Sequence, residues 1–428
     1  MITNIYREVT SKEESISKKE QKKIIKKLVS QLDDQFENIL IIPPDYTRQH
    51  SGAGQITSLL YKFLKNKVNI TIMPALGTHK PMTEKEIRNM FGENIPLDIF
   101  KVHDYINDTV SIGTIPQKYV NEVSNGRVNR SIDVKVNKEL VSDKYDAIIS
   151  VGQVLPHGVV GMSNYNKNIL VGCGGSKMID ISHYIGAAYG MEKLLGKDHS
   201  PVRKILDYAE KNFLDDTNIL YVLTVNSIEI NPITELTDML GIFIGKERKV
   251  FEKAVEASQK FNINELDQPV KKMVVYMDGD EFQSTWLACK AIYRTRLVIA
   301  DGGELIVLAP GLKSFGENEK IDDLIKKYGY MGKEKIIQYV KENEDLDQNL
   351  AAAAHLIHGS TNGRFSVTFA TDKLSKKELN NVNHGHMSFE KAKEIYDYEN
   401  LEYGYNKLKD GQKVFYIENP ATGLWKLK

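Results

Sequence analysis

Two histidines and a lysine stand in one glycine-rich stretch of the chain, residues 152–183. These side chains are His157, Lys167 and His183. The stretch follows the apolar run 145–151, which predicts a strand buried on both faces. Glycines after such a strand let the backbone turn with positive φ and approach a ligand closely. Each of these residues alone is usually an ordinary loop residue, but together they predict a loop that moves protons or binds an anion.

Three further side chains of the same kind follow two earlier apolar runs. Asp45 and Arg48 come after the run 38–42, and His79 comes after the run 68–73. Arginine offers a planar fork for a carboxylate or phosphate, and histidine titrates near neutrality. Two histidines on opposite sides of a substrate would suit a racemase, which takes a proton from one face and returns it on the other. A third imidazole could hold a metal.

Strand-like and helical runs alternate along the first part of the chain. This alternation predicts an α/β fold with a mostly parallel sheet covered on both faces. Loops after parallel strands lie on one edge of a sheet, so the candidate side chains are expected to converge there. The expected strands are 38–42, 68–73, 97–102, 147–151, 219–225 and 241–244, and the expected helices include 55–64 and 246–260.

A polar segment near residues 262–270 predicts a linker between two α/β domains. The expected division is an N-terminal domain over 1–268, which carries cofactor and acid–base residues, and a C-terminal domain over 269–400, which contributes substrate contacts. The active site is expected in the cleft between them. The tail 401–428 holds one expected strand, 414–418, and is expected to pack back on the first domain. The second domain should contain strands 273–277, 297–300, 304–309 and 365–370, and a helix 282–293 with Trp286 and Lys290 one turn apart.

Composition excludes several classes of function. The 57 basic and 57 acidic side chains cancel, so there is no bulk attraction to nucleic acid or to an anionic membrane. The two cysteines, Cys173 and Cys289, form no CxxC pattern, so no disulfide framework or zinc knuckle is implied. No run approaches the roughly 18 apolar residues of a membrane span, and no signal peptide is apparent. A cytoplasmic protein is expected.

The ordered set of motifs resembles the lactate racemase family, the nickel-pincer-nucleotide-dependent racemases and epimerases of 2-hydroxy acids. Each motif is loose alone, but the order and spacing over most of the chain are fairly specific. The motifs are Asp45-Tyr46-Thr47-Arg48, Gly77-Thr78-His79, His157 with Lys167 and His183, Trp286 with Lys290, residues 302–310 (GGELIVLAP), and Phe315-Gly316.

The resemblance implies a role for each candidate residue. Lys167 would carry the cofactor, a pyridinium-derived mononucleotide with thioamide and thiocarboxylate groups, and His183 would ligate its Ni(II). His79 and His157 would be the acid–base pair while hydride leaves the substrate carbon for the cofactor and returns. Arg48, Lys290 and Trp286 would contact the substrate. Asp45 would orient neighbouring groups, and the cofactor phosphate is expected on the backbone amides of Gly172, Gly174, Gly175 and Ser176.

Two departures from the family pattern bear on the substrate and the cofactor loop. Residues 163–166 (SNYN) stand where the family usually has glycines. Trp286-Leu287 stands where lactate-active members tend to show Tyr-Gln, which removes a polar substrate contact. A bulkier or longer 2-hydroxy acid, including a sugar acid, is as consistent with this helix as lactate is. The implied partners are this acid and the cofactor-synthesis enzymes.

Two other classes of protein stay open at this point. One is an oxidoreductase that uses a free nicotinamide, although no G-x-G-x-x-G lies between a strand and a helix of the first domain. The other is a non-catalytic binding protein on the same fold.

Overall fold

The computed structural model describes residues 3–32, 36–231, 236–421 and 423–428. The chain divides into two compact units: a first unit of residues 1–182 and 196–262, and a second unit of residues 183–195 and 263–428. The division differs from the expected one because residues 183–195 belong to the second unit. It falls inside helix α6 (Ser176–Tyr189), so Lys167 belongs to the first unit and His183 to the second.

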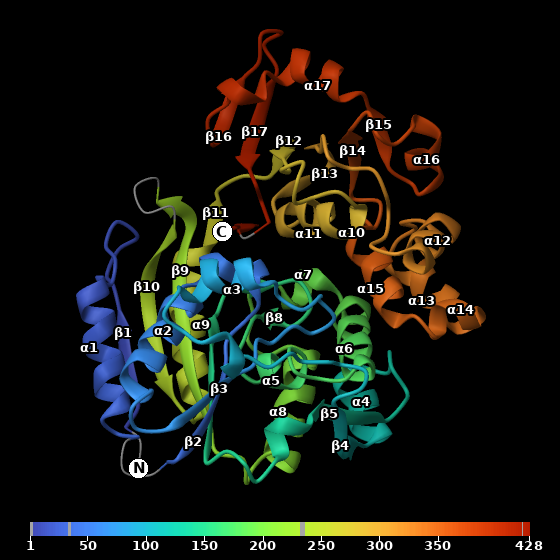
Figure 1. Cartoon of the computed structure of the whole chain (residues 1–428). Coiled ribbons are helices and arrows are strands. Elements are labelled where there is room, and N and C mark those ends of the chain that lie inside the picture. Colours follow the sequence, from blue (N-terminus) through green and yellow to red (C-terminus); the bar gives the residue numbers. More distant parts are fainter. Residues whose placement is uncertain (1–2, 33–35, 232–235, 422) are drawn as a thin grey trace. The chain divides into compact units, whose positions relative to one another are not determined.

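A six-stranded sheet in the order β1-β10-β9-β6-β2-β3 forms the centre of the first unit (Figure 1). β9, β6, β2 and β3 are parallel to one another, and β10 and β1 extend the sheet in antiparallel fashion. β2 and β6 are almost wholly buried, as their continuous apolar runs predict for inner strands. The strands are β1 (Ile5–Glu8), β2 (Asn38–Ile42), β3 (Asn69–Ile72), β6 (Ala147–Gln153), β9 (Ile219–Asn231) and β10 (Leu236–Gly245).

Capping boxes start two helices of the first unit. A Ser17 capping box starts α1 and a Thr83 capping box starts α3, each satisfying two otherwise unbonded backbone groups. The remaining elements are the two-stranded sheets β4-β5 and β7-β8 and a set of helices. They are α1 (Lys18–Val29), η1 (Tyr46–Ser51), α2 (Ala53–Leu64), α3 (Glu84–Phe91), η2 (Leu97–Ile99), β4 (Thr109–Ile115), α4 (Gln117–Val123), β5 (Ile132–Asn137), η3 (Lys138–Val141), β7 (Pro156–His157), β8 (Gly161–Met162), α5 (Asn166–Leu170), α8 (Pro201–Phe213) and α9 (Arg248–Asn262).

The second unit has its own six-stranded sheet in the order β15-β14-β13-β12-β17-β16. All neighbouring pairs are parallel except β16 with β17. The strands and helices are α7 (Met191–Leu194), β11 (Ile263–Leu266), β12 (Val270–Tyr276), α10 (Thr285–Ala288), α11 (Lys290–Thr295), β13 (Ile299–Leu308), α12 (Glu319–Tyr328), α13 (Lys333–Glu342), α14 (Glu344–Asp347), α15 (Leu350–His358), β14 (Phe365–Ala370), α16 (Lys376–Asn381), β15 (Gly385–Met387), α17 (Phe389–Tyr396), η4 (Tyr398–Asn400), β16 (Gly404–Lys407), β17 (Lys413–Glu418) and β18 (Leu424–Leu427).

The mixed α/β class with mostly parallel sheets is confirmed, and several element predictions are corrected. Residues 97–102 form the short helix η2 and a single bridge from Phe100 to Ile72, not a strand. One strand, β13, replaces the two expected at 297–300 and 304–309, because the Gly302-Gly303 pair continues the strand. The expected helix 282–293 is two short helices, α10 and α11, that meet at Cys289.

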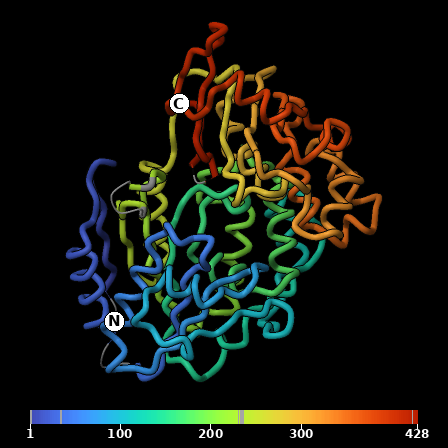
Figure 2. Tube along the Cα trace, turned by 45° about the horizontal axis from the view of Figure 1, so that its top comes forward, coloured from blue at the N-terminus to red at the C-terminus, as the bar shows by residue number. Residues whose placement is uncertain are grey.

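The tail 401–428 belongs to the second unit. Its strand β17 pairs in parallel with β12, so its red trace runs beside the yellow trace of β12 (Figure 2). β16 then covers the open edge of β17, and β18 pairs with β11. The apolar run 414–417 is buried in this position, which explains why the tail adds strands to the sheet of the second unit.

Candidate active site

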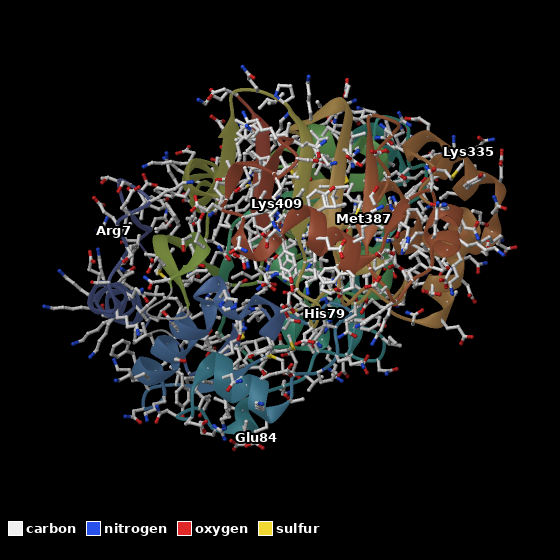
Figure 3. The ribbon with its side chains drawn as sticks, turned by 90° about the horizontal axis from the view of Figure 1, so that it is seen from above. Arg7, His79, Glu84, Lys335, Met387 and Lys409 are labelled. Carbon is white, nitrogen blue, oxygen red and sulfur yellow. The ribbon has the colours of Figure 1, made fainter. Side chains whose placement is uncertain are left out.

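A carboxylate and an imidazole form a close pair at the carboxyl ends of two adjacent parallel strands. Asp45 follows β2 and His79 follows β3, and the Asp45 Oδ2 atom lies 2.6 Å from the His79 Nδ1 atom. Asp45 is buried, whereas the side chain of His79, the residue labelled in Figure 3, is 53% exposed. The Thr47 hydroxyl donates to the other Asp45 oxygen at 2.6 Å. Because Asp45 accepts the Nδ1 proton, the neutral His79 ring presents an unprotonated Nε2 atom to its surroundings.

The ionised form of Asp45 is favoured by its partners. Burial raises the pKa of this carboxyl, but the hydrogen bond and charge of His79, the Thr47 hydroxyl and the charge of Arg48 outweigh it, and the net pKa is lowered. Arg48 itself is exposed on η1, directly after Thr47. The site therefore holds a carboxylate that orients a base, beside an exposed guanidinium that suits an anionic substrate group.

Lys167 stands at the start of α5, and its neighbours tie this helix to the ends of the central strands. The side-chain amide of Asn168 donates to the Ile42 carbonyl oxygen at the end of β2 (3.1 Å) and to the Ser150 hydroxyl of β6 (3.0 Å). The Gly77 N–H donates to the Gly172 carbonyl oxygen at 2.8 Å, which joins the His79 loop to the turn after α5. The sequence predicted that these loops converge, and these bonds bring the Asp45, His79 and Lys167 loops together.

The Lys167 amine lies in a setting that favours its neutral form. Burial, and then the charges of Arg48 and Arg203, lower the pKa of Lys167 to about 8, against the opposing charge of Asp45. An amine with this pKa is partly unprotonated near neutral pH and is therefore a competent nucleophile. The first unit thus gathers a reactive amine with the Asp45–His79 pair.

His157 lies on β7, in the connection that leaves β6. The Val159 N–H donates to its Nδ1 atom at 3.1 Å. A neutral His157 ring therefore carries its proton on Nε2, the reverse of His79. The two histidines have complementary tautomers, one with an accepting Nε2 and one with a donating Nε2.

The glycines after α5 pack so closely against this helix that a side chain would not fit. A Cβ atom at Gly174 would lie 2.0 Å from the Leu170 carbonyl oxygen, and one at Gly172 would lie 2.4 Å from that of Asn168. The amides of these glycines already donate within the chain, Gly172 to Lys167 and Gly175 to Lys135. Phosphate binding by the amides of Gly172, Gly174 and Gly175 therefore stays a prediction, and it would require these bonds to be exchanged. Ser176 is exposed at the first residue of α6.

Sequence reasoning missed the side chain that holds this turn. His103 is buried, and its Nε2 atom lies 3.2 Å from the Gly174 carbonyl oxygen. The Asn137 amide bonds its Nδ1 atom at 3.0 Å, which leaves Nε2 as the donor. Burial lowers the pKa of His103, so the ring stays neutral. No pattern in the sequence distinguished His103 from other loop histidines.

In the second unit, Trp286 and Lys290 lie on α10 and α11, and both are partly buried. The Trp286 ring packs on His355 of α15, with centroids 4.6 Å apart. The Lys290 amine lies over the Phe282 ring, 5.3 Å from its centroid. The single helix predicted to carry both residues is divided at Cys289.

A buried hydrogen-bond chain lies behind Trp286, and the sequence did not reveal it. The Tyr330 hydroxyl bonds the Thr285 hydroxyl at 2.7 Å and the His355 Nε2 atom at 2.8 Å. The Thr285 hydroxyl donates to the Phe315 carbonyl oxygen, which also accepts the Trp286 N–H. Because each hydroxyl has one proton, the chain runs from His355 Nε2–H through Tyr330 and Thr285 to Phe315. Burial lowers the pKa of His355 to about 3, so His355 remains a neutral donor.

His183 lies on the part of α6 that belongs to the second unit and is partly buried. Burial, and then the charge of His183, lower the pKa of His358 on α15. The sequence placed His183 on the same loop as Lys167, but it lies on the helix that follows.

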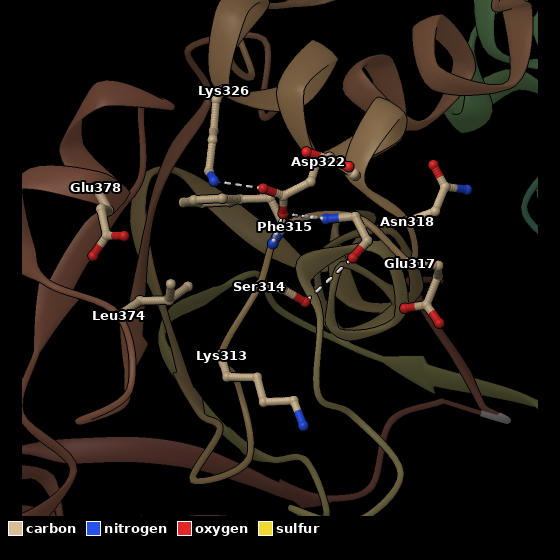
Figure 4. A pocket seen from close by; sticks show the side chains of 11 residues that line it. Lys313, Ser314, Phe315, Glu317, Asn318, Asp322, Lys326, Leu374 and Glu378 are labelled. Atoms are coloured by element: carbon tan, nitrogen blue, oxygen red, sulfur yellow. Dashed lines mark hydrogen bonds and ion pairs between the residues drawn. The ribbon is translucent and has the colours of Figure 1, made fainter.

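The Phe315-Gly316 motif forms one wall of a pocket of about 350 Å³ in the second unit (Figure 4). The amides of Phe315 and Gly316 both donate to the Asp322 carboxylate, at 2.7 and 2.9 Å, and Lys326 pairs with the same carboxylate. These bonds fix the motif to α12 and lower the pKa of Asp322, with burial as the opposing effect. These bonds give the Phe315-Gly316 motif a structural role.

Metal clusters and membrane-spanning helices are both absent from the described part of the chain. The described residues contain no group of three or more His, Cys, Asp or Glu side chains that could hold a metal ion. No helix among the described residues is both long and apolar enough to cross a membrane.

Fold and site define a two-unit α/β protein with a candidate acid–base centre at the carboxyl ends of parallel strands. Residues 1–192 match the family model of the lactate racemase N-terminal domain. Over this domain the chain is similar to the lactate racemases, which confirms the resemblance seen in the sequence. This relationship supports an isomerase of the racemase type as the class of activity.

Two lactate racemases are similar in sequence. That of Thermoanaerobacterium thermosaccharolyticum is 26% identical over 314 residues, which are 71% of this chain and 67% of that protein. That of Lactiplantibacillus plantarum is 29% identical over 184 residues, 42% of this chain and 40% of that protein.

Two solved structures share the fold. A Thermotoga maritima protein solved by a structural genomics consortium has a TM-score of 0.81 and 26% identity, and the match covers 96% of this chain and 98% of that one. The lactate racemase apoprotein of T. thermosaccharolyticum has a TM-score of 0.70 and 18% identity, with 95% and 93% coverage. At that identity the second match supports the fold alone.

Proposed function

We propose that the protein is a racemase or epimerase of a 2-hydroxy acid that works with a nickel-pincer nucleotide attached to Lys167. The observation that carries this proposal is the pairing, in one unit, of an amine of lowered pKa with the Asp45–His79 dyad. Lactate racemases among the sequence relatives support the reaction type.

His79 is the proposed base for one enantiomer of the substrate. Asp45 holds its Nδ1 proton, so Nε2 is the atom that takes the proton of the substrate hydroxyl. The imidazolium that forms is stabilised by the buried carboxylate. His157 is the proposed partner, because its Nε2 carries a proton in the neutral ring and can return it to the opposite face.

The substrate carboxylate is the proposed partner of Arg48, an exposed guanidinium beside the dyad. By family resemblance, Lys290 and Trp286 are proposed to contact the same substrate. Trp286-Leu287 offers an apolar surface in this segment, which suits a 2-hydroxy acid larger than lactate, such as a sugar acid.

The chain's residues fit the cofactor in two respects. Lys167 has the partly neutral amine that an amide-type link requires, and His183 supplies one imidazole, a donor that suits Ni(II) beside soft sulfur ligands. When bound, the cofactor supplies the acceptor and donor of hydride. Loading it on Lys167 makes the cofactor-synthesis enzymes necessary partners.

The test is expression of the full chain together with cofactor-synthesis enzymes, followed by mass analysis of the peptide that contains Lys167. We expect added mass on this peptide, nickel in the protein, and loss of optical activity in a panel of 2-hydroxy acids. Lys167→Arg should remove the mass, the nickel and the activity. Unmodified Lys167 in a protein that racemises one of these acids would refute the tethered cofactor, and turnover that requires free nicotinamide would favour the oxidoreductase.

A further inference from the structure

The backbone just before Lys167 is held in a conformation that side chains rarely adopt. Asn164 has φ of 61° and Tyr165 has φ of 59°. The Tyr165 ψ of −137° lies next to a region of backbone space that is almost restricted to glycine. Such a conformation persists only where its surroundings hold it. Something in the first unit must therefore stabilise this turn.

Arg203 of α8 is the side chain that hydrogen-bonds to this turn. It is fully buried, and its Nη2 atom donates to the carbonyl oxygens of Met162 (2.7 Å) and Asn164 (3.3 Å). Its Nη1 atom donates to the side-chain oxygen of Asn166, the residue directly before Lys167. One planar fork thus bonds the chain on both sides of Tyr165.

Aromatic packing holds the same guanidinium and the same tyrosine. The Tyr165 ring stacks on Phe251 of α9, with centroids 4.9 Å apart and planes at 12°. The Arg203 guanidinium lies 4.4 Å from the Phe251 centroid, a cation–π distance. Tyr221 of β9 closes the other side of Tyr165 at 4.3 Å. The strained residue is thereby fixed from three elements.

The side-chain amide of Asn166 links Arg203 to two carboxyl groups. The Asn166 Nδ2 atom donates to Asp207 (2.7 Å) and to Glu210 (3.0 Å), while its oxygen accepts from Arg203. Burial raises the pKa of both carboxyls, against the opposing charge of Arg203. Asn166 uses its donors and its acceptor in this network, so any movement of the residue before Lys167 breaks several buried bonds.

We propose that Arg203 is a positioning residue for Lys167: its fork holds residues 162–166 in the strained turn that leads directly into this lysine. Arg203 is also the second of the two positive charges that act on Lys167. The role assigned to the amine rests on the proposed function, but the positioning itself does not. The proposal explains how side chains stand where glycines are usual in this segment, because buried contacts hold the backbone.

The test measures the pH dependence of acetylation of Lys167 by acetic anhydride in the full chain without cofactor, with peptide mass spectrometry as the readout. Exposed Lys18 provides an internal reference. In the unsubstituted protein we expect a midpoint near pH 8. Arg203→Met should move the Lys167 midpoint upward, and a midpoint that is higher by about one pH unit means a roughly tenfold smaller neutral fraction at neutral pH.

Two further variants separate positioning from general destabilisation. Arg203→Lys keeps a cation but loses the fork, so we expect a smaller upward change of the midpoint with faster amide hydrogen exchange over 162–168. This variant decides the question if Arg203→Met does not fold. Arg296→Met removes a comparably buried arginine of the second unit, paired with Glu192, and should leave the Lys167 midpoint unchanged.

Unchanged midpoints and exchange in the Arg203 variants would overturn the proposal, even if Lys167 carries a cofactor. A higher midpoint in the Arg203 variants alone supports it, even if Lys167 never gains mass. An equally raised midpoint in Arg296→Met would also overturn it, because the effect would then come from lost stability.

Discussion

The Nδ1 atom of His79 lies 2.6 Å from Oδ2 of Asp45, and the two residues follow neighbouring parallel strands, β3 and β2. Asp45 is buried and its pKa is lowered, whereas the imidazole is exposed. A buried carboxylate behind an exposed ring selects the tautomer whose Nε2 accepts a proton, and it stabilises the protonated ring. This arrangement distinguishes His79 from an ordinary turn histidine.

Replacement of the carboxylate by its neutral isostere tests this arrangement. In Asp45→Asn the amide group can donate to Nδ1 and favour the wrong tautomer. We expect kcat for racemisation to fall by roughly 10²–10⁴-fold with a smaller change in KM. The measurement is initial-rate polarimetry of cofactor-loaded protein. Asp104→Asn is the control, because the Asp104 carboxylate accepts local N–H groups from Ile106 and Asn107; equal losses in the two variants would contradict the dyad.

The two histidines should be needed for turnover but not for the metal. His79→Ala and His157→Ala are each expected to lower racemisation by about 10²–10⁴-fold, a typical loss for a missing acid or base. Nickel content, measured by elemental analysis, should stay that of the unsubstituted protein, whereas His183→Ala should lower it. Full activity in either alanine variant would show that its histidine has another role.

Substrate preference should reflect the Trp286-Leu287 segment. Because Leu287 cannot hydrogen-bond a small polar acid, we expect slow turnover of lactate and faster turnover of a longer 2-hydroxy acid. Rates for a panel of acids of increasing length, measured on one loaded preparation, check this. Leu287→Gln should change the preference toward lactate, while Leu312→Met, a change in the buried core, should not. Rapid lactate racemisation by the unsubstituted protein would refute the expectation.

The hydrogen-bond chain behind Trp286 should contribute measurably to stability. Tyr330→Phe leaves the His355 Nε2–H without its acceptor in a buried site, so we expect a loss of about 1–3 kcal/mol in the free energy of unfolding. Urea denaturation measures it. Tyr328→Phe is the matched control, because its partner Asp345 is 42% exposed and can bond water instead. An equal cost in both variants would show that the chain contributes nothing special.

The sequence predicted the parallel strands and their loops well, because period and composition are local signals. β2 and β14 begin and end at the expected residues, and the Asp45, His79 and Lys167 loops converge as predicted. Residues 97–102 have the composition of a strand, yet Pro96 and the start of η2 divert them. Local sequence preference could not predict that residues 97–102 leave the sheet, because this depends on which sheet edge is free to accept another strand.

The supporting residues of the site were out of reach of sequence reasoning. Arg203, His103 and Tyr330 act through contacts with residues far away along the chain. Nothing in their own neighbourhoods marks them. The close packing of the glycines against α5 was hidden for a related reason: it is a property of the fold, whereas a loop that binds phosphate has the same composition.

Acid should destabilise the second unit through its buried histidines. His355 and His384 are neutral in the folded protein because burial lowers the pKa of each to about 3. The ordinary histidine pKa is about 6.5, so between roughly pH 6.5 and pH 3 the unfolded chain binds more protons than the folded one. Stability is therefore present above about pH 6.5 and lost as the pH falls. His384→Phe should reduce this slope, because a phenyl ring can keep the stack on Tyr330 without taking a proton. Urea midpoints at about pH 7.5 and about pH 5 measure the slope, with exposed His199→Phe as the control; equal slopes in all three proteins would show that His384 titrates as it does in the unfolded chain.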